Sequence, residues 1–393
     1  MMHNITVGID IGTYQIKVVV AELVKNGNKS VPRIIATGLT ESKGMRHGYI
    51  LNVADVTASI NAAVAQAEKT AGIKIRKAFI AIGGIGLQGI TSTGNIVISR
   101  ADLEITNLDI DKVSEICEQD IPPTLIQNRK ILHAIPLSYK IDGKSVPTKT
   151  PLGMKGVKLE VKTLFVTCLE PHLNDLMQAL DDANIYVSDV MASPLAASFV
   201  TLNKTQKIAG CVLANIGAET ISIVVYENNI PISLEVFPIG SNDITNDIAL
   251  GLKIPLEEAE NIKIGSVGSQ NYPKKKLEEI INARLSDMFE LIENHLKKIS
   301  RNGLLPAGIL ITGGGGNIGT IEDLAKAALK IPSRIAKLNL PEQKNRVKDS
   351  TWAVAYGLCV LGFSDEGKDT LGNRGKASDA WGKIGKWLKQ FLP

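Results

Sequence analysis

Residues 7–20, VGIDIGTYQIKVVV, and residues 212–225, VLANIGAETISIVV, carry the pattern that decides the fold. Each stretch has a run of β-forming residues, a short polar turn that contains glycine, and a second β-forming run, which together predict a β-hairpin. The two stretches align with Asp10 matched to Asn215, an offset of 205 residues. A repeat at this distance predicts two related lobes, each of which opens with the same hairpin.

The segments between and after the hairpins alternate between helical and strand patterns, which predicts a mixed α/β fold. Before the second hairpin, we expect helices at 53–71, 109–119 and 171–183, and strands at 77–82, 94–98, 131–141 and 158–167. After it, we expect helices at 242–264, 274–300, 320–330 and 351–362, and a short apolar strand at 308–312.

Composition excludes several classes of protein. A chain of 393 residues is too long for one ordinary core and predicts two to four domains or subdomains. The net charge of +4 is too small to indicate a nucleic-acid binder. The cysteines form no CxxC pair, which predicts a reducing compartment, and the histidines show no metal-ligand spacing. There is no signal-peptide pattern and no apolar run of about 18 residues, so we expect any membrane contact to be peripheral.

The turn of the first hairpin has the residue types that a phosphate-binding loop needs. Backbone N–H groups at residues 10–14 can bind phosphate oxygens, Gly12 permits a close approach, and the Thr13 hydroxyl adds a donor. Asp10 can orient a water bound to Mg²⁺, and Lys17 can neutralise phosphate charge. An ordinary β-hairpin is the alternative for one copy alone, whereas two facing copies favour a phosphate site.

A third glycine-rich element follows the predicted strand at 308–312. The run Gly313–Gly316 precedes a predicted helix, and such an element lets a phosphate or a base approach the backbone closely. It contains a formal GxGxxG at Gly314, Gly316 and Gly319, which is typical of dinucleotide folds. The position about 20 residues further on holds Arg334, where a ribose hydroxyl needs an acidic residue, so the dinucleotide interpretation is disfavoured.

Glu257, Glu260 and Lys263 lie in one predicted helix, within the segment PLEEAENIK at 255–263. On spacing alone, Glu260 and Lys263 favour a solvent-exposed ion pair between positions i and i+3. The same residues form an AExxK-like segment at 259–263.

Three further segments, together with the paired hairpins, the AExxK-like segment and the glycine run, resemble a known family. They are GLTESKGMRHGYI at 38–50, PLGMKGVKLEV at 151–161 and DITNDIALGL at 243–252. The features resemble the actin–Hsp70–sugar kinase superfamily and, more specifically, the FtsA family of bacterial cell-division proteins. The resemblance covers nearly the whole chain. It implies an α/β, two-lobed actin-like (ribonuclease H-like) ATPase fold that binds ATP and Mg²⁺ between its lobes, with one subdomain missing and an α+β subdomain inserted elsewhere.

The resemblance also implies how the chain divides into subdomains. We expect a first actin-like lobe at 1–82 with 166–207 and 347–363, an inserted subdomain at 83–165, a second lobe at 208–245 with 306–346, a small helical subdomain at 246–305, a linker at 364–378 and a membrane-binding amphipathic helix at 379–393.

The nucleotide contacts of the family transfer to matching positions of this chain. The resemblance implies that both hairpin turns contact phosphate, that the AExxK-like segment contacts the ribose or base, and that the glycine run lies on the adenosine side. Two positions depart from the family pattern, because Asn215 stands where Asp is usual and Glu219 where Gly is usual. An anion beside a polyphosphate is unfavourable, so we expect at most a weak ATPase and assign no catalytic residue. The expected site comprises Asp10, Gly12, Thr13, Tyr14, Lys17, Asn215, Gly217, Ala218, Glu219, Thr220, Glu260, Lys263, Gly313, Gly314, Gly315 and Gly316.

The C-terminal segment has the spacing of an amphipathic helix. From Ser364 the composition turns polar, as in a flexible linker, and large apolar residues then recur at helical intervals with lysines on the opposite side. This pattern predicts a helix that lies on an anionic membrane surface, and the alternative is packing on the chain's own core or in a partner's groove. The apolar face is Trp381, Ile384, Trp387, Leu388, Phe391 and Leu392, and the basic face is Lys383, Lys386 and Lys389.

The resemblance implies partners and a location. FtsA-like proteins assemble into filaments and tether the tubulin-like ring protein FtsZ to the cytoplasmic face of the membrane at the division site, where the septum forms. The FtsZ C-terminal tail docks on the small helical subdomain, and the cations that could accept it here are Arg284, Lys297, Lys298 and Arg301. The alternatives are an actin-like scaffold of a pilus or secretion system and a sugar-kinase-like enzyme of the same superfamily.

Overall fold

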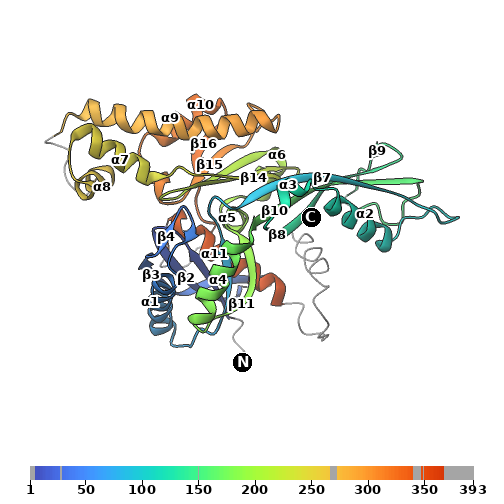
Figure 1. Ribbon diagram of the computed structural model, residues 1–393, viewed down its shortest axis with the longest axis horizontal. Helices are drawn as coiled ribbons and strands as arrows, with labels where there is room; N and C mark the ends of the chain where they lie inside the picture. The colour runs from blue at the N-terminus through green and yellow to red at the C-terminus, as the bar shows by residue number, and fades with distance from the viewer. Residues whose placement is uncertain are drawn as a thin grey trace.

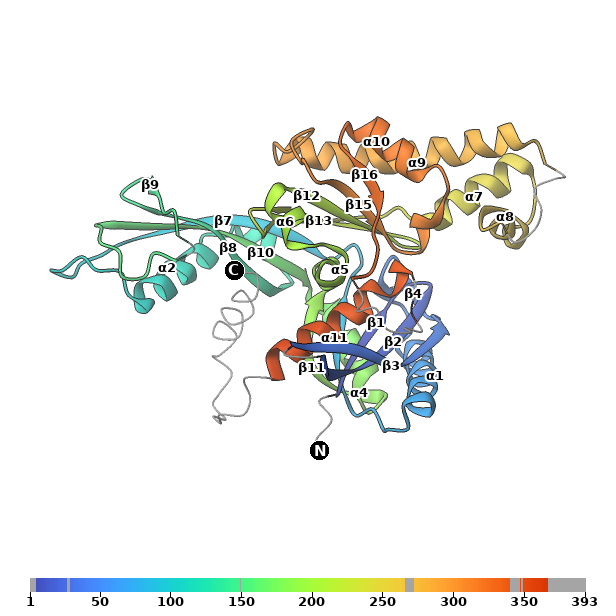
Figure 2. The same cartoon turned by 180° about the vertical axis from the view of Figure 1, so that it is seen from behind.

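The computed structural model describes residues 5–26, 29–148, 150–265, 272–339, 347 and 349–366. Two five-stranded sheets form the centre of the molecule, and a four-stranded sheet projects to one side of them (Figure 1). Turning the molecule around shows the first sheet below, the second sheet with its helices above, and the projecting sheet at the side (Figure 2).

The first sheet contains the first predicted hairpin. Its strand order is β11-β6-β1-β2-β3, with β1 antiparallel to β2 and parallel to β6. The strands are β1 (Ile5–Ile11), β2 (Gln15–Asn26), β3 (Lys29–Glu41), β6 (Lys77–Ile82) and β11 (Tyr186–Ala192).

The second sheet repeats this topology with the second hairpin. Its order is β16-β15-β12-β13-β14, with β12 antiparallel to β13 and parallel to β15. The cross-strand registers agree with the sequence alignment, because Asp10 pairs with Lys17 and Asn215 pairs with Ser222. The prediction of two lobes built on one hairpin pattern is confirmed. The strands are β12 (Cys211–Ile216), β13 (Ile221–Glu227), β14 (Ile230–Phe237), β15 (Gly308–Thr312) and β16 (Ser333–Ile335).

Helices cover both faces of the first sheet. Helix α1 (Val53–Ala71) packs on one face, where a Cβ at Gly38 would lie 1.9 Å from the Ala63 carbonyl oxygen. Helix α11 (Ala353–Glu366) packs on the other face, where a Cβ at Gly8 would lie 2.2 Å from the Ala355 carbonyl oxygen. The faces are opposite because Gly8 pairs with Val19 and Gly38 pairs with the adjacent residue of β2.

The second sheet buries its two faces in two different cores. Alternate residues of β12, such as Val212 and Ala214, pack against α7 (Ser241–Leu252), α8 (Leu256–Lys263), α9 (Lys274–Lys298) and α10 (Ile321–Leu329). Leu213 faces the other way, into a core shared with the first lobe and α5 (Ser193–Thr201). This alternation is the period of two that a β-strand imposes on its side chains. It makes the two lobes continuous through one apolar core.

The inserted subdomain is a separate α+β unit. Its sheet has the order β7-β10-β8-β9 and packs its own core against α2 (Asn107–Gln119). It abuts the second lobe at β14, where a Cβ at Gly89 would lie 2.8 Å from the Leu234 carbonyl oxygen. The remaining elements are β4 (Met45–Arg46), β5 (Tyr49–Ile50), β7 (Gln88–Val97), β8 (Arg129–Ile141), β9 (Lys144–Ser145), β10 (Lys158–Leu169), α3 (Pro123–Ile126), α4 (Glu170–Asp182), α6 (Lys204–Ala209), η2 (Gly314–Asn317) and η3 (Ser350–Trp352).

The structure corrects several expected elements. The single helix expected at 242–264 is wrong, because the structure has two helices there. Helix α7 ends at Leu252, the next residue Lys253 is left-handed (φ 58°), and Pro255 then precedes α8. The strand expected at 94–98 begins earlier, at Gln88. Strands β3, β11 and β14 and helices α5 and α6 were not expected at all. The linker expected at 364–378 is wrong for its first three residues, which form the end of α11. The rest of this linker and the predicted amphipathic helix lie outside the described residues. Within the described ranges, no helix has the length and apolar character needed to span a membrane.

Replacing Gly8 with Ala is expected to lower the free energy of unfolding by about 1–3 kcal/mol, because the new methyl group would push α11 off β1. Urea unfolding followed by circular dichroism measures the change. The matched control is Gly319→Ala, since a Cβ at Gly319 meets no atom within 4 Å. Equal stability of the two variants would show that α11 tolerates displacement from the sheet.

Candidate functional site

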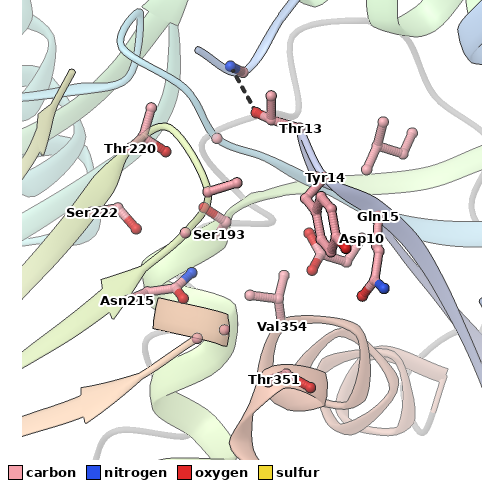
Figure 3. A pocket seen from close by; sticks show the side chains of 18 of the residues that line it. Asp10, Thr13, Tyr14, Gln15, Ser193, Asn215, Thr220, Ser222, Thr351 and Val354 are labelled. Atoms are coloured by element: carbon pink, nitrogen blue, oxygen red, sulfur yellow. Dashed lines mark hydrogen bonds between the residues drawn. The ribbon is translucent and has the colours of Figure 1, made fainter. Parts of the chain in front are cut away.

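A cleft of about 300 Å³ lies between the two lobes, where the two hairpin turns face each other. Figure 3 shows Asp10, Tyr14 and Gln15 of the first hairpin on one side and Asn215, Thr220 and Ser222 of the second on the other. The beginnings of α5, α7 and α11, the end of β6 and part of α8 also contribute to the lining.

Most of the residues that the sequence selected line this cleft. They are Asp10, Gly12, Thr13, Tyr14, Lys17, Asn215, Gly217, Ala218, Thr220, Glu260, Lys263, Gly313 and Gly314. Three others do not line it. Gly315 and Gly316 pack behind the cleft, where a Cβ would lie 2.5 Å from Ile216 Cγ2 and 3.2 Å from Ile311 Cγ2, respectively. The carboxylate of Glu219 instead binds the backbone of His47.

The two hairpin turns close through the same type of backbone hydrogen bond. The Gly12 N–H donates to the Gln15 carbonyl at 3.2 Å, and the Gly217 N–H donates to the Thr220 carbonyl at 2.8 Å. The N–H groups of the two residues that follow each glycine, at 13–14 and 218–219, donate to no described residue. Such unpaired N–H groups in successive residues of a turn can bind anionic oxygens. The cleft therefore has N–H donors from the hairpin turns of both lobes.

One carboxylate, Asp10, stands beside these donors at the end of β1. Burial raises its pKa, and the cross-strand neighbour Lys17 lowers it in part. The corresponding residue of the second hairpin is the uncharged Asn215, and a Cβ at Gly313 would lie 2.4 Å from its Oδ1. Gly313 has φ +90°, so both space and backbone conformation require glycine at that position. Negative charge at this end of the cleft thus comes from one lobe only.

At another part of the lining, Glu260 and Lys263 belong to a half-buried hydrogen-bond network. Lys263 Nζ lies 2.7 Å from Glu260 Oε2 and donates to Thr245 Oγ1 at 2.8 Å and to the Ser241 carbonyl at 3.1 Å. The Thr245 hydroxyl in turn donates to Glu260 Oε2 at 2.5 Å. Only 7% of the Lys263 side chain is exposed, so the interpretation as a solvated ion pair is wrong for this lysine. The network ties α8 to the beginning of α7 at the wall of the cleft.

Comparisons with known proteins identify the family. The family model of cell division protein FtsA matches residues 212–357, and the model of the SHS2 domain inserted in FtsA matches residues 84–167. The cell division protein FtsA of Borreliella burgdorferi is 30% identical over 387 residues, which cover 92% of this chain and 91% of that protein. The chain belongs to the FtsA family.

Solved structures support the fold of this FtsA-family chain. A PilM–PilN type IV pilus biogenesis complex contains a chain with a TM-score of 0.66 and 17% identity, and the match covers 91% of this chain and 98% of that one. MreB5 of Spiroplasma citri bound to ADP gives a TM-score of 0.53 at 11% identity, and the match covers 94% of this chain and 99% of that one. The predicted two-lobed, actin-like α/β fold with an inserted subdomain is confirmed.

Several cleft residues of this FtsA-family chain were missed at the level of sequence. Ser193 follows β11 and begins α5 immediately before Pro194, a helix-start pattern that could have indicated it. His172 is buried at the cleft wall, where burial lowers its pKa, and its ring meets Tyr49 edge to face at 5.1 Å. No sequence signal marks a lone histidine of this kind.

The four cations expected to receive a partner's tail lie on or just beyond α9, and three already have carboxylate partners. Arg284 bonds Asp247 through Nε at 2.6 Å and Nη2 at 3.0 Å. Lys297 pairs with Glu293 at 2.9 Å, and Arg301 pairs with Glu227 at 2.8 Å. Lys298 is exposed and forms no ion pair with any residue that the structure describes.

Replacing Asp10 with Asn is expected to stabilise the protein in the absence of any ligand. Burial raises the pKa of Asp10 above its ordinary value of 3.8, so the folded state holds this proton more tightly than the unfolded chain does. The stability contributed by the wild-type carboxyl is therefore greatest below pH 3.8 and falls as pH rises through the folded-state pKa. The gain from Asp10→Asn near pH 8 is about 1.4 kcal/mol for each unit between the two pKa values, measured by urea unfolding.

Asn215→Asp is the matched variant for this test. It places a carboxylate at the corresponding position of the second hairpin, where the cross-strand neighbour is Ser222 instead of a lysine. It is expected to destabilise the ligand-free protein near pH 8. Equal stability of Asp10→Asn and wild type across the pH range would contradict the inference that burial disfavours the charged form of Asp10.

Proposed function

We propose that this chain is an ATP-binding, actin-like cell-division protein that assembles into filaments and tethers an FtsZ ring to the cytoplasmic membrane. The observation that carries the proposal is the pair of hairpin turns that face each other across one cleft in a member of the FtsA family. The expected subdomain division, including the small helical subdomain at 246–305, belongs to the same proposal.

The lining of the cleft fits a nucleoside triphosphate with its metal ion. Unpaired N–H groups at 13–14 and 218–219 suit phosphate oxygens, and Lys17 adds a positive charge beside them. Asp10 would hold Mg²⁺ through a bound water, and the metal would neutralise part of the phosphate charge. Glu260 and Lys263 would contact the ribose or base. MreB5 of Spiroplasma citri, which shares the fold, has been solved with ADP and with AMPPNP.

The same lining supports at most weak hydrolysis of ATP. The carboxylates that line the cleft are Asp10 and Glu260, and Glu260 is already engaged by Lys263 and the Thr245 hydroxyl. Transfer of a phosphoryl group to water needs a residue that orients the attacking water. The position of the second hairpin that corresponds to Asp10 holds the uncharged Asn215. This lining also gives no support to a sugar-kinase activity, which needs a carboxylate base beside a sugar hydroxyl.

Replacing Lys17 with Met is expected to weaken the binding of Mg-ATP about 10-fold or more, because a hydrogen bond to a charged group contributes about 1.5–3 kcal/mol. Binding is measured by fluorescence titration with an ATP analogue in the presence of Mg²⁺. The control is Lys69→Met, a lysine in the exposed last turn of α1. The proposal is wrong about the nucleotide if wild-type protein binds no ATP at millimolar concentration.

Attachment to the membrane is assigned to the C-terminal segment on its sequence alone. The apolar face from Trp381 to Leu392 and the lysines at 383, 386 and 389 suit the boundary of an anionic bilayer. One short helix of this kind is a weak anchor. Filaments would carry many copies, so avidity would make the attachment firm.

The FtsZ tail is assigned to the helical subdomain at 246–305, where Lys298 is the best placed of the four cations. Arg284 lies 14 residues before it, or roughly 20 Å along α9, so the two cannot form one compact site. Arg284, Lys297 and Arg301 are also neutralised within the chain. An acidic or carboxylate-bearing tail would therefore be attracted most strongly near the C-terminal end of α9.

Two variants separate the membrane and FtsZ functions in one vesicle co-sedimentation experiment. A chain that ends at Glu366 is expected to lose binding to anionic vesicles and to keep binding to an FtsZ tail peptide. Lys298→Glu is expected to keep vesicle binding and to weaken peptide binding several-fold, since it reverses a charge at the docking surface. The tether is contradicted if the shortened chain still sediments with vesicles, and the docking site is contradicted if Lys298→Glu binds the peptide normally.

A further inference from the structure

The turn between β4 and β5, at residues 45–50, touches the phosphate-binding turns of both lobes. The Gly48 N–H donates to Thr13 Oγ1 of the first hairpin at 3.1 Å, the bond drawn as a dashed line in Figure 3. The His47 N–H donates to Glu219 Oε2 of the second hairpin at 2.5 Å, and His47 Nδ1 lies 3.2 Å from the Glu219 carbonyl oxygen. Met45 and Gly48 line the cleft itself.

The turn is firmly held on the side of the first lobe. Its backbone lies against the loop after β6, where a Cβ at Gly48 would be 2.3 Å from Gly84 Cα. The Ile85 N–H donates to the His47 carbonyl at 3.2 Å. His47 (φ 47°) and Gly48 (φ 83°) are both left-handed, as a tight two-residue turn between antiparallel strands requires.

On the side of the second lobe, the turn is held through Glu219. This residue stands 172 positions away in the sequence, and its carboxylate accepts the His47 N–H instead of lining the cleft. A hydrogen bond with a charged acceptor is roughly twice as strong as a neutral one.

The two lobes are also joined along α5. Its Ser198 hydroxyl lies 2.7 Å from the Tyr226 hydroxyl of β13 in the buried core. A connection through a continuous core cannot open without exposing apolar surface, whereas hydrogen bonds between two turns can break and re-form. Opening of the cleft at these turns therefore requires both contacts between His47 and Glu219 to break.

We infer that the turn at 45–50 is a latch across the cleft and that Glu219 is the positioning residue that holds it closed. The inference rests on the proposed binding of nucleotide in this cleft. With the latch closed, the two sets of phosphate donors stay at a fixed separation, and nucleotide enters or leaves only when the latch opens. Glu219 thus sets the rate of nucleotide exchange. Its hydrogen bond to the His47 N–H also holds its carboxylate away from the phosphates.

The test measures release of a fluorescent ATP analogue from the full-length chain in the presence of Mg²⁺. Glu219→Gly is expected to release the nucleotide about 10-fold faster or more, since the lost bond to a charged acceptor corresponds to at least one decade in an equilibrium constant. Glu219→Gln keeps an acceptor without the charge and is expected to show a smaller increase. The control is Glu290→Gln, an exposed residue of α9.

Hydrogen–deuterium exchange of the peptide at 44–51, measured without nucleotide, tests the latch independently. Glu219→Gly is expected to increase its exchange, whereas Glu290→Gln leaves it unchanged. Normal exchange and normal release in both Glu219 variants would overturn the latch and leave nucleotide binding intact. Tighter binding with an unchanged release rate would also overturn it, because Glu219 would then act by repelling phosphate. If no form of the chain binds nucleotide, the proposed function and the role in nucleotide exchange both fail, even if the exchange of this peptide still responds to Glu219.

Discussion

The repeated hairpin turn is the constraint on which the rest of the structure depends. In each lobe the turn closes through a bond from a glycine N–H to the residue three positions on, and this leaves the next two N–H groups without a partner in the described structure. N–H groups in successive residues of a turn can donate to anionic oxygens, so two such turns facing each other favour an anion between them. The flanking sheets, with identical strand order, hold the turns in opposition.

The charged side chains that line the cleft are balanced between the two lobes. Asp10 is partly offset by Lys17, and Glu260 by Lys263, so each lobe brings one carboxylate and one ammonium group to the lining. The second pair is fixed by hydroxyl and carbonyl partners. The first pair has no such framework among the described residues, which leaves Asp10 and Lys17 able to respond to a metal ion and to phosphate.

The lobes are joined in two physically different ways. Along α5 they share one apolar core, which gives a connection that cannot open without exposing buried surface. At the cleft they are joined by polar bonds between turns, which can break and re-form. The inserted subdomain meets the second lobe where the backbone of Gly89 lies close to β14, so a movement of that lobe would displace the subdomain.

The sequence by itself determined the two hairpins, their alignment and most of the regular elements, because the periods of two and 3.6 and the glycine turns report local conformation directly. Of the cleft lining it selected the hairpin turns and, through the resemblance to the FtsA family, the AExxK-like segment and part of the glycine run. It missed the residues that α4, α5, α7, α11 and the loop after β6 contribute. The break after α7 was missed although Pro255 marks it in the sequence, because a proline cannot continue a helix from the preceding turn. Only the tertiary structure decided that the Lys263 side chain is buried, that Glu219 binds His47, and that two of the four cations near α9, Arg284 and Arg301, pair with carboxylates of other elements. The orientation of a charged side chain depends on partners brought near by packing, and no local pattern encodes a partner 172 residues away.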